Sequence, residues 1–272
     1  MRPILFYLGD YPIFAYRALL AVAILAGHRV FSAHASRRQL DPRRALELQI
    51  LLVLAGLFGS RLIEVALFWD FYGHNPDQIL RFWSSGLTFY GGLLLAFPIC
   101  AAFTRAVGWS LLEVLDMLAP AVAVGLAIGR LGCLLAGCCY GMASELPWAL
   151  AFPRAGESIP RHPTQAYEML ACFAIFLVLQ RSLAGAGRPA GWVIALFACL
   201  YGGFRFTVEF WREDPRGGLF FGLFSFSQLV SIGIVGAAAV WLVARRRPGG
   251  AALAESPAAP ANEIERPTLR AR

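Results

Sequence analysis

Long apolar stretches dominate this chain and limit what it can fold into. Each stretch is about 20 residues long, enough for a helix to cross the hydrocarbon of a bilayer. A mean hydropathy of +0.60 and a charged fraction of 15% over 272 residues leave no room for a large soluble domain. The stretches predict seven spanning helices, at about 12–32, 45–69, 86–105, 111–138, 164–183, 190–210 and 224–244.

We therefore expect an all-α polytopic membrane protein in two parts. Residues 1–247 form a seven-helix transmembrane domain. Residues 248–272 are rich in Ala and Pro with scattered charges, a composition that cannot bury a core and predicts a disordered cytoplasmic tail. No internal repeat is visible, which argues against a transporter built from inverted repeats.

The net charge of +7 follows the topology and does not indicate a nucleic-acid partner. All basic residues are Arg, and they are denser in alternate connections between the apolar stretches. By the positive-inside rule this places the N-terminus outside and the C-terminus in the cytoplasm, in agreement with seven spans. Arg17 interrupts the first apolar run and no small-residue cleavage site follows, so we expect this helix to be retained.

Four arginines lie inside the apolar stretches: Arg17, Arg61, Arg130 and Arg205. At about 3 kcal/mol each on insertion scales, they cost on the order of 10 kcal/mol in lipid unless they face a wet cavity or an anionic partner. The anion that a membrane offers is a lipid phosphate. The sequence therefore predicts a phosphate-binding site within the bilayer.

A glycine-rich segment surrounds one of these arginines. Gly129, Arg130, Gly132 and Gly141 are arranged so that backbone can approach a ligand and the guanidinium has room to grip a phosphate. The alternative is a small-residue face for helix packing, with Arg130 extending to the membrane surface.

A second polar pattern consists of Tyr201, Arg205, Glu209 and Arg212, spaced four, four and three residues apart. On one helix these residues would share a face, which must point to the protein interior. The alternative is a simple ion pair between Arg205 and Glu209 that joins helices.

The segment before the fifth span offers His162, which is a candidate general base because imidazole titrates near neutral pH. Pro163 suits a helix N-terminus, which Thr164 or Gln165 would cap. The alternative for His162 is an ordinary surface histidine.

A glycine pair, Gly91-Gly92, follows Tyr90 at the start of the third span. It predicts either a close backbone approach or a broken helix end. Tyr90 and Tyr16 also suit an aromatic belt at the membrane surface, and the three-residue spacing of Arg61 and Glu64 permits an ion pair.

Three of the six cysteines, Cys133, Cys138 and Cys139, lie close together in the sequence. Their spacing fits neither a CxxC redox pair nor a haem site, and no nearby His suggests zinc. We expect no metal here and predict structural cysteines or a disulfide, with Cys100, Cys172 and Cys199 in the core.

Taken in order, these motifs resemble bacterial prolipoprotein diacylglyceryl transferases from about Tyr16 to Ser231. The matching positions are Tyr16, Gly59-x-Arg61-Leu62, Gly91-Gly92, Gly129-Arg130-x-Gly132, Pro163-x-Gln165-x-Tyr167-Glu168, Tyr201-x-x-x-Arg205-Phe206-x-x-Glu209-Phe210-x-Arg212 and Ser225-x-x-Gln228.

The resemblance implies transfer of a diacylglyceryl group from phosphatidylglycerol to the lipobox cysteine of a preprolipoprotein signal peptide, with release of glycerol phosphate. It implies a multi-pass protein of the bacterial cytoplasmic (inner) membrane, contacting membrane lipids, with its active site toward the outer face and no cofactor. The implied catalytic residues are Arg130, Arg205, Tyr90, His162 and Glu209. The implied substrate-binding residues are Tyr16, Arg61, Gly91, Gly92, Gly129, Gly132, Gly141, Gln165, Tyr167, Glu168, Tyr201 and Arg212.

Departures from the family pattern fall in two places. Cys133, Leu134, Ala136 and Cys138 stand where the family usually has Asn-Phe-x-Asn-x-Glu, and Tyr90 stands where it often has His. Three alternatives remain open: a paralogue with another acceptor, a membrane thiol oxidoreductase built on the three cysteines, and a lipid-binding transporter.

Overall fold

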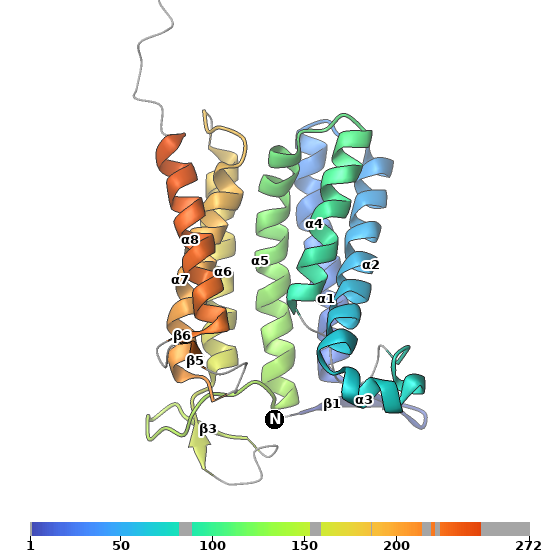
Figure 1. Ribbon diagram of the computed structural model, residues 1–272, viewed down its shortest axis with the longest axis vertical. Coiled ribbons are helices and arrows are strands. Elements are labelled where there is room, and N and C mark those ends of the chain that lie inside the picture. The colour runs from blue at the N-terminus through green and yellow to red at the C-terminus, as the bar shows by residue number, and fades with distance from the viewer. Residues whose placement is uncertain are drawn as a thin grey trace, which may run out of the picture.

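Parallel and antiparallel helices of similar length make up most of the molecule (Figure 1). The computed structural model describes residues 2–81, 89–152, 159–185, 187–213, 219–220 and 224–245. The side chain of Tyr90 and the tail expected at 248–272 lie outside the described residues. The long helices are α1 (Ala15–Arg37), α2 (Pro42–Leu67), α4 (Phe89–Ala106), α5 (Leu111–Ala136), α6 (Thr164–Ala184), α7 (Trp192–Val208) and α8 (Phe226–Ala244).

Helix α5 lies at the centre of the bundle, with α1, α2 and α4 on one side and α6, α7 and α8 on the other (Figure 1). One buried apolar cluster, including Phe31, Leu48 and Met117, packs α1, α2 and α4 against the first half of α5. A second, including Ile175 and Leu179, packs α6 and α7 against it. The two halves of the bundle are therefore joined through α5.

The helix ends follow local sequence signals. Asp41 accepts a hydrogen bond from the backbone N–H of Arg43 at the start of α2, where Pro42 takes the first helical position. Ser225 and Gln228 form a capping box at the start of α8. Gly137, with φ of 70°, ends α5 in the left-handed conformation that glycine adopts without steric cost.

Short elements gather at the end of the bundle where α1 begins (Figure 1). They are the hairpin β1–β2 (Ile4–Leu8 and Tyr11–Phe14), α3 (Trp69–His74), η1 (Pro76–Gln78), the pair β3–β4 (Leu150–Ala151 and Pro160–Arg161), η3 (Glu209–Trp211) and the pair β5–β6 (Leu219–Phe220 and Phe224–Ser225). The opposite end carries only short connections between helices in the part of the chain that the structure describes.

Six helices are long and apolar enough to cross a membrane: α1, α2, α5, α6, α7 extended by η3, and α8. The protein is therefore an all-helical polytopic membrane protein, as the sequence predicted. Of the expected seven spans, the third is the exception, because the apolar segment Gly91–Ala106 of α4 is shorter than the others.

Three local predictions were wrong. The first helix begins at Ala15 and not near residue 12, because Tyr11–Phe14 pairs with β1. The fourth span, expected at 111–138, ends at Ala136 as helix α5, so Gly141 lies beyond the helix and cannot belong to a small-residue helix face. Helix α7 ends at Val208, and Arg212 is extended backbone beyond η3, so Tyr201 and Arg212 do not lie on one continuous helix.

Candidate active site

The residues expected at the site gather at one end of the bundle. This is the end where α5 and α7 finish and α6 begins, and where the N-terminal hairpin also lies (Figure 1). Arg17 lies at this end too, but it is the exposed one of the four arginines expected within the membrane. It lies in the first turn of α1, exposed, with its guanidinium 4.8 Å from the ring centroid of Phe14.

Glu168, in the second turn of α6, is the hub of the site. Its side chain is 1% exposed, and its Oε1 accepts hydrogen bonds from Arg130 Nη2 at 2.8 Å and from the Tyr201 hydroxyl at 3.3 Å. Its Oε2 lies 4.0 Å from Arg212 Nη1. One buried carboxylate therefore joins α5, α7 and the segment after η3.

Arg205 and Glu209 form the second ion pair of the site. Arg205 Nη1 lies 2.7 Å from Glu209 Oε2, and both side chains are almost fully enclosed. Glu209 Oε1 in turn accepts a hydrogen bond from the hydroxyl of Ser225 at 2.9 Å. Ser225 is also the residue that caps α8. The ion pair predicted from the four-residue spacing is confirmed, and the Ser225 hydrogen bond connects it to α8.

Gly141 lies where three chain segments meet. Its N–H donates to the carbonyl oxygen of His162 at 2.9 Å, and it forms an isolated antiparallel bridge with Arg212. A Cβ placed on Gly141 would lie 2.8 Å from Thr164 Cγ2 and 2.9 Å from His162 Cβ. Glycine is required here because the loop after α5, the start of α6 and the segment after η3 come together without room for a side chain.

His162 lies in an aromatic group at the same end. Its Nδ1 is 3.3 Å from the Tyr167 hydroxyl, which accepts a hydrogen bond from Trp148 Nε1 at 2.8 Å. Its ring centroid is 6.3 Å from that of Trp211. The Nε2 atom makes no hydrogen bond to any described residue.

The three neighbouring cysteines, although separated by up to six positions in the sequence, come together as free thiols. Their Sγ atoms all lie within 4.8 Å of one another. This is the group in the described residues that has the donor set of a metal site, and no disulfide forms among the three.

The cap expected at the start of α6 was wrong. Neither Thr164 nor Gln165 bonds the first turn of the helix; the cap position is Pro163, without a side-chain hydrogen bond. Instead, Thr164 Oγ1 donates to the carbonyl oxygen of Cys139 at 2.9 Å, and Gln165 Nε2 donates to that of Cys138 at 2.6 Å. Both side chains hold the cysteine loop in place.

The glycines of α5 differ in their surroundings. A Cβ on Gly132 would lie 3.3 Å from Tyr16 Cδ2, so Gly132 lets α1 pack closely at Tyr16. A Cβ on Gly129 would meet nothing within 4 Å. Packing therefore explains Gly132 but not Gly129.

The glycine pair of α4 allows the backbones of α4 and α2 to approach each other closely. A Cβ on Gly91 would clash with the carbonyl oxygen of Gly59, and one on Gly92 would lie 2.9 Å from the carbonyl oxygen of Gly56. Of the two alternatives, close backbone approach is confirmed. Arg61, on the same stretch of α2, is buried and donates to the carbonyl oxygens of Gln78 and, at 3.0 Å, of Ile79, so it fastens η1 to the bundle.

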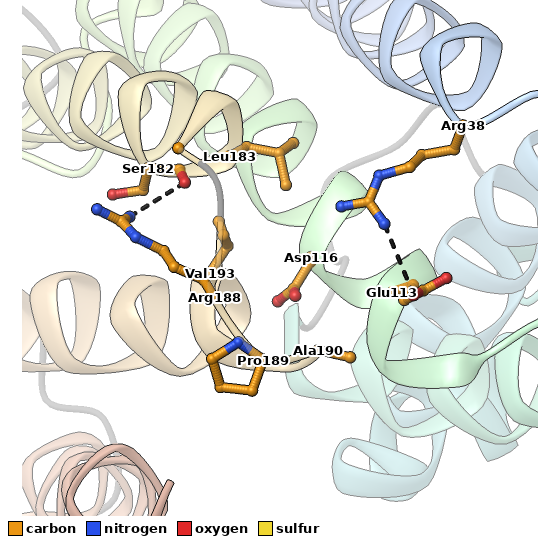
Figure 2. A pocket seen from close by; sticks show the side chains of 10 residues that line it. Arg38, Glu113, Asp116, Ser182, Leu183, Arg188, Pro189, Ala190 and Val193 are labelled. Carbon is orange, nitrogen blue, oxygen red and sulfur yellow. Dashed lines mark hydrogen bonds and ion pairs between the residues drawn. The ribbon is translucent and has the colours of Figure 1, made fainter. Parts of the chain in front are cut away.

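A pocket lies at the opposite end of the bundle, about 20 Å from Arg130 along α5. Figure 2 shows its lining, in which Asp116 stands between Arg188 and Glu113. The Asp116 carboxylate accepts hydrogen bonds from the backbone N–H groups of Gly191 and Ile194, each at 2.8 Å. Asp116 therefore has a structural explanation, since it accepts hydrogen bonds from backbone N–H groups at the start of α7 that have no partner within the helix.

Sequence reasoning missed Trp148, gave Thr164 the different role of a helix cap, and assigned Ser225 and Gln228 only through a resemblance. Ser-x-x-Gln is a capping-box pattern, which was a usable signal for these last two residues. Nothing in the sequence shows that Thr164 bonds Cys139, because the two residues are 25 positions apart.

Comparison with known proteins agrees with this arrangement. Residues 3–244 match the family model described as prolipoprotein diacylglyceryl transferase. The chain is similar to proteins named phosphatidylglycerol–prolipoprotein diacylglyceryl transferase from Geobacter sulfurreducens (33% identical over 256 residues, 91% of this chain and 97% of the relative) and Clostridium tetani (32% over 237 residues, 85% and 93%). The similarly named protein of Azotobacter vinelandii is 38% identical over 237 residues, 84% of each chain.

The match covers all of the spanning helices and the whole of the described site. It does not favour the oxidoreductase or transporter alternatives. The chain belongs to the prolipoprotein diacylglyceryl transferase family.

Proposed function

We propose that this protein transfers the diacylglyceryl group of phosphatidylglycerol to the lipobox cysteine thiol of a prolipoprotein. The thiol sulfur attacks the glyceryl carbon that carries the phosphate; an S–C bond forms and the C–O bond breaks. The electron pair of that bond leaves with glycerol phosphate, and the thiol proton passes to a base. The observation that carries the proposal is the buried cluster of arginines and glutamates at one end of a chain that belongs to this family.

Arg130 is the first half of a phosphate clamp. Among the described residues it makes one hydrogen bond, to Glu168, and its side chain remains 19% exposed. A guanidinium has five N–H donors, so most of them stay available for phosphate oxygens. The leaving phosphate gains negative charge in the transition state, and a fixed cation in a poorly hydrated site stabilises that charge.

Arg205 is the second half of the clamp, with Glu209 as its positioning residue. The ion pair and the Ser225 hydroxyl hold the Arg205 guanidinium in one orientation before substrate binds. Such preorganisation removes the cost of reorienting the group during the reaction. Glu168 does the same for Arg130 and Arg212.

The remaining expected residues divide by their surroundings. We assign Tyr16, Gly129, Tyr201 and Arg212 to the lipid headgroup, because Gly129 is open and the others surround the Glu168 hub or the end of α5. His162 is the candidate base for the thiol and Tyr90 a candidate hydrogen-bond donor to the ester or phosphate oxygens. Tyr167 orients His162.

The proposed placement is in the bacterial inner membrane. Residues 1–247 would form one catalytic domain with seven spans, α4 being the seventh, with the N-terminus outside and the C-terminus cytoplasmic. The site would then open toward the outer face, because it shares an end with the N-terminal hairpin (Figure 1). The excess of Arg in the connections at the opposite end supports this orientation.

The activity is tested with labelled phosphatidylglycerol and a lipobox peptide, and by growth of a strain depleted of its own transferase. Arg130→Ala and Arg205→Ala should each abolish transfer while the protein still inserts in the membrane. Lys at either position should restore little, because it lacks the planar fork. Wild-type turnover in either Ala variant would refute the clamp.

The orientation is tested separately with topology reporters. A reporter fused after Arg272 should be cytoplasmic, and one inserted after Glu145, an exposed residue of the loop after α5, should be external. The reverse result at either position would contradict the proposed orientation without affecting the assignment of the reaction.

A further inference from the structure

Three thiols meet where α5 ends. Cys133 lies in the last turn of the helix, Gly137 turns the chain back, and Cys138 and Cys139 follow directly. The three Sγ atoms lie within 4.8 Å of one another, with Cys133 buried and the other two partly exposed. No other group of three His, Cys, Asp or Glu side chains comes together in this way within the described residues.

The backbone that carries these thiols is held from several sides. The N–H of Cys138 donates to the carbonyl oxygen of Cys133 at 3.2 Å. The side chains of Thr164 and Gln165, each no more than 1% exposed, bond the carbonyl oxygens of Cys139 and Cys138. The three sulfurs are therefore presented by a fixed loop, supported by buried outer partners such as those that orient metal ligands.

Cys139 adopts a backbone conformation that non-glycine residues rarely adopt. Its φ is 62°, in the left-handed region, which costs on the order of 1 kcal/mol or more. Such strain persists only where surrounding contacts impose it and is concentrated at functional positions. Here the conformation lets Cys139 contribute to the same group of sulfurs as Cys138.

The spacing of the sulfurs fits coordination by one ion. With Zn–S bonds of about 2.3 Å in tetrahedral geometry, the sulfurs of a zinc site are roughly 3.8 Å apart. The observed group lies within 4.8 Å, so closure needs a movement of about 1 Å shared among three side chains. A disulfide would use only two of the three thiols and leave the third unmatched.

We propose that Cys133, Cys138 and Cys139 bind a thiophilic divalent cation, for which Zn²⁺ is the probe, through three thiolates with the fourth position open. Binding releases the three thiol protons to water. The resulting complex has a net charge of −1, and Arg130 is a nearby cation, one helical turn before Cys133 on the same face. Soft sulfur ligands favour Zn²⁺ over Mg²⁺ or Ca²⁺.

The ion would brace the junction at which the arginines converge. The loop that follows the thiols leads to Gly141, which is bonded to His162 and paired with Arg212. Fixing this loop to the end of α5 therefore fixes the position of Arg130 relative to Arg212. The proposal does not depend on the chemistry of lipid transfer, and its test reads metal binding directly.

The first experiment measures metal on the purified full-length protein in detergent. Elemental analysis should find about one Zn²⁺ per chain after saturation and dialysis. Removal by a chelator and addition of Co²⁺ should produce a near-ultraviolet charge-transfer band from thiolate ligands, which Zn²⁺ then abolishes. Zn²⁺ should also raise Tm by about 5 °C and protect the two partly exposed thiols, Cys138 and Cys139, from alkylation.

The variants distinguish a site from chance binding. Cys133→Ser, Cys138→Ser and Cys139→Ser should each weaken Zn²⁺ binding by about 100-fold or more, and Thr164→Val by about 10-fold. Cys199→Ser is the matched control, because this thiol lies on α7 facing Val235 and should leave binding unchanged.

Either of two results on the wild-type protein would overturn the proposal. One is the absence of bound metal and of a cobalt thiolate band, with Cys138 and Cys139 alkylated equally fast with and without Zn²⁺. The other is a disulfide among the three in protein isolated without reductant. The protection measurement uses the unaltered chain, so the proposal remains testable even where a serine variant fails to fold.

Discussion

Replacement of Glu168 by glutamine tests the central feature of the site. The variant keeps the shape of the side chain and one oxygen acceptor but removes the negative charge that contacts both Arg130 and Arg212. Because the Glu168 side chain is only 1% exposed, water cannot reach this position to solvate the arginines in place of the lost carboxylate. Arg130 and Arg212 then each lose one anionic contact.

The magnitude follows from the distances. Arg130 lies 2.8 Å and Arg212 4.0 Å from the Glu168 oxygens. At an effective dielectric constant of about 20, unit charges at these distances attract by roughly 6 and 4 kcal/mol. Removing one member of a buried ion pair costs about 3–5 kcal/mol after relaxation. For a chain of this size that corresponds to a fall in Tm of about 10 °C.

Transfer should fall by about 100-fold or more, because misplacing the Arg130 guanidinium forfeits stabilisation that the phosphate needs in the transition state. The assay is turnover of labelled phosphatidylglycerol, measured beside Tm and the size-exclusion profile. Activity is scored only on protein that elutes as wild type, so that loss of fold and loss of chemistry are separated.

Glu113→Gln is the control for loss of a carboxylate. Glu113 pairs with Arg38 at 3.6 Å at the opposite end of the bundle, where both side chains are about half exposed. Such pairs contribute about 0–1 kcal/mol, so Tm and turnover should stay close to wild type. Unchanged Tm together with unchanged turnover in Glu168→Gln would refute the role assigned to this hub.

Three further outcomes are expected. Gly141→Ala should lower Tm, because the added methyl group overpacks the site at a cost of about 1–3 kcal/mol. Gly129→Ala should leave Tm unchanged and reduce transfer. Equal Tm for the two variants would contradict the close approach at Gly141. Asp116→Ala removes the hydrogen-bond acceptor of two backbone N–H groups at the start of α7 and should lower stability by about 1–3 kcal/mol. Turnover of the folded variant should be normal. A selective loss of turnover would give the pocket around Asp116 a catalytic role. If His162 takes the proton of the acceptor thiol, His162→Gln should lower the transfer rate most near neutral pH. The rate should recover above about pH 8.5, where a free thiol ionises unaided. Parallel pH profiles of the variant and the wild type would exclude His162 as the base.

Helix positions were predictable because they depend on local composition. The fifth span, expected at 164–183, is Thr164–Ala184, and the fourth, expected from residue 111, begins at Leu111. A run of about 20 apolar residues commits a segment to a bilayer whatever its neighbours are. Errors arose at helix ends, as at Tyr11–Phe14, where pairing with another strand decided the boundary.

The ion pair of Arg205 and Glu209 was also predictable, since a four-residue spacing on a helix brings two side chains together. The partner of Arg130 was not, because Glu168 lies 38 positions away on another helix. Glu168 stood out in the sequence only as part of a motif, and nothing local indicates that three basic or hydroxyl groups converge on it.

The sequence by itself determined that this chain is a helical membrane protein with costly buried arginines, because apolar length and charge are properties of each segment alone. Only the tertiary structure decided which acid neutralises which arginine, why Gly141 cannot carry a side chain, and that three thiols share one site. Those properties depend on contacts between the ends of α5, α6 and α7, and such contacts are fixed by how the helices pack and not by the residues next to them in the chain.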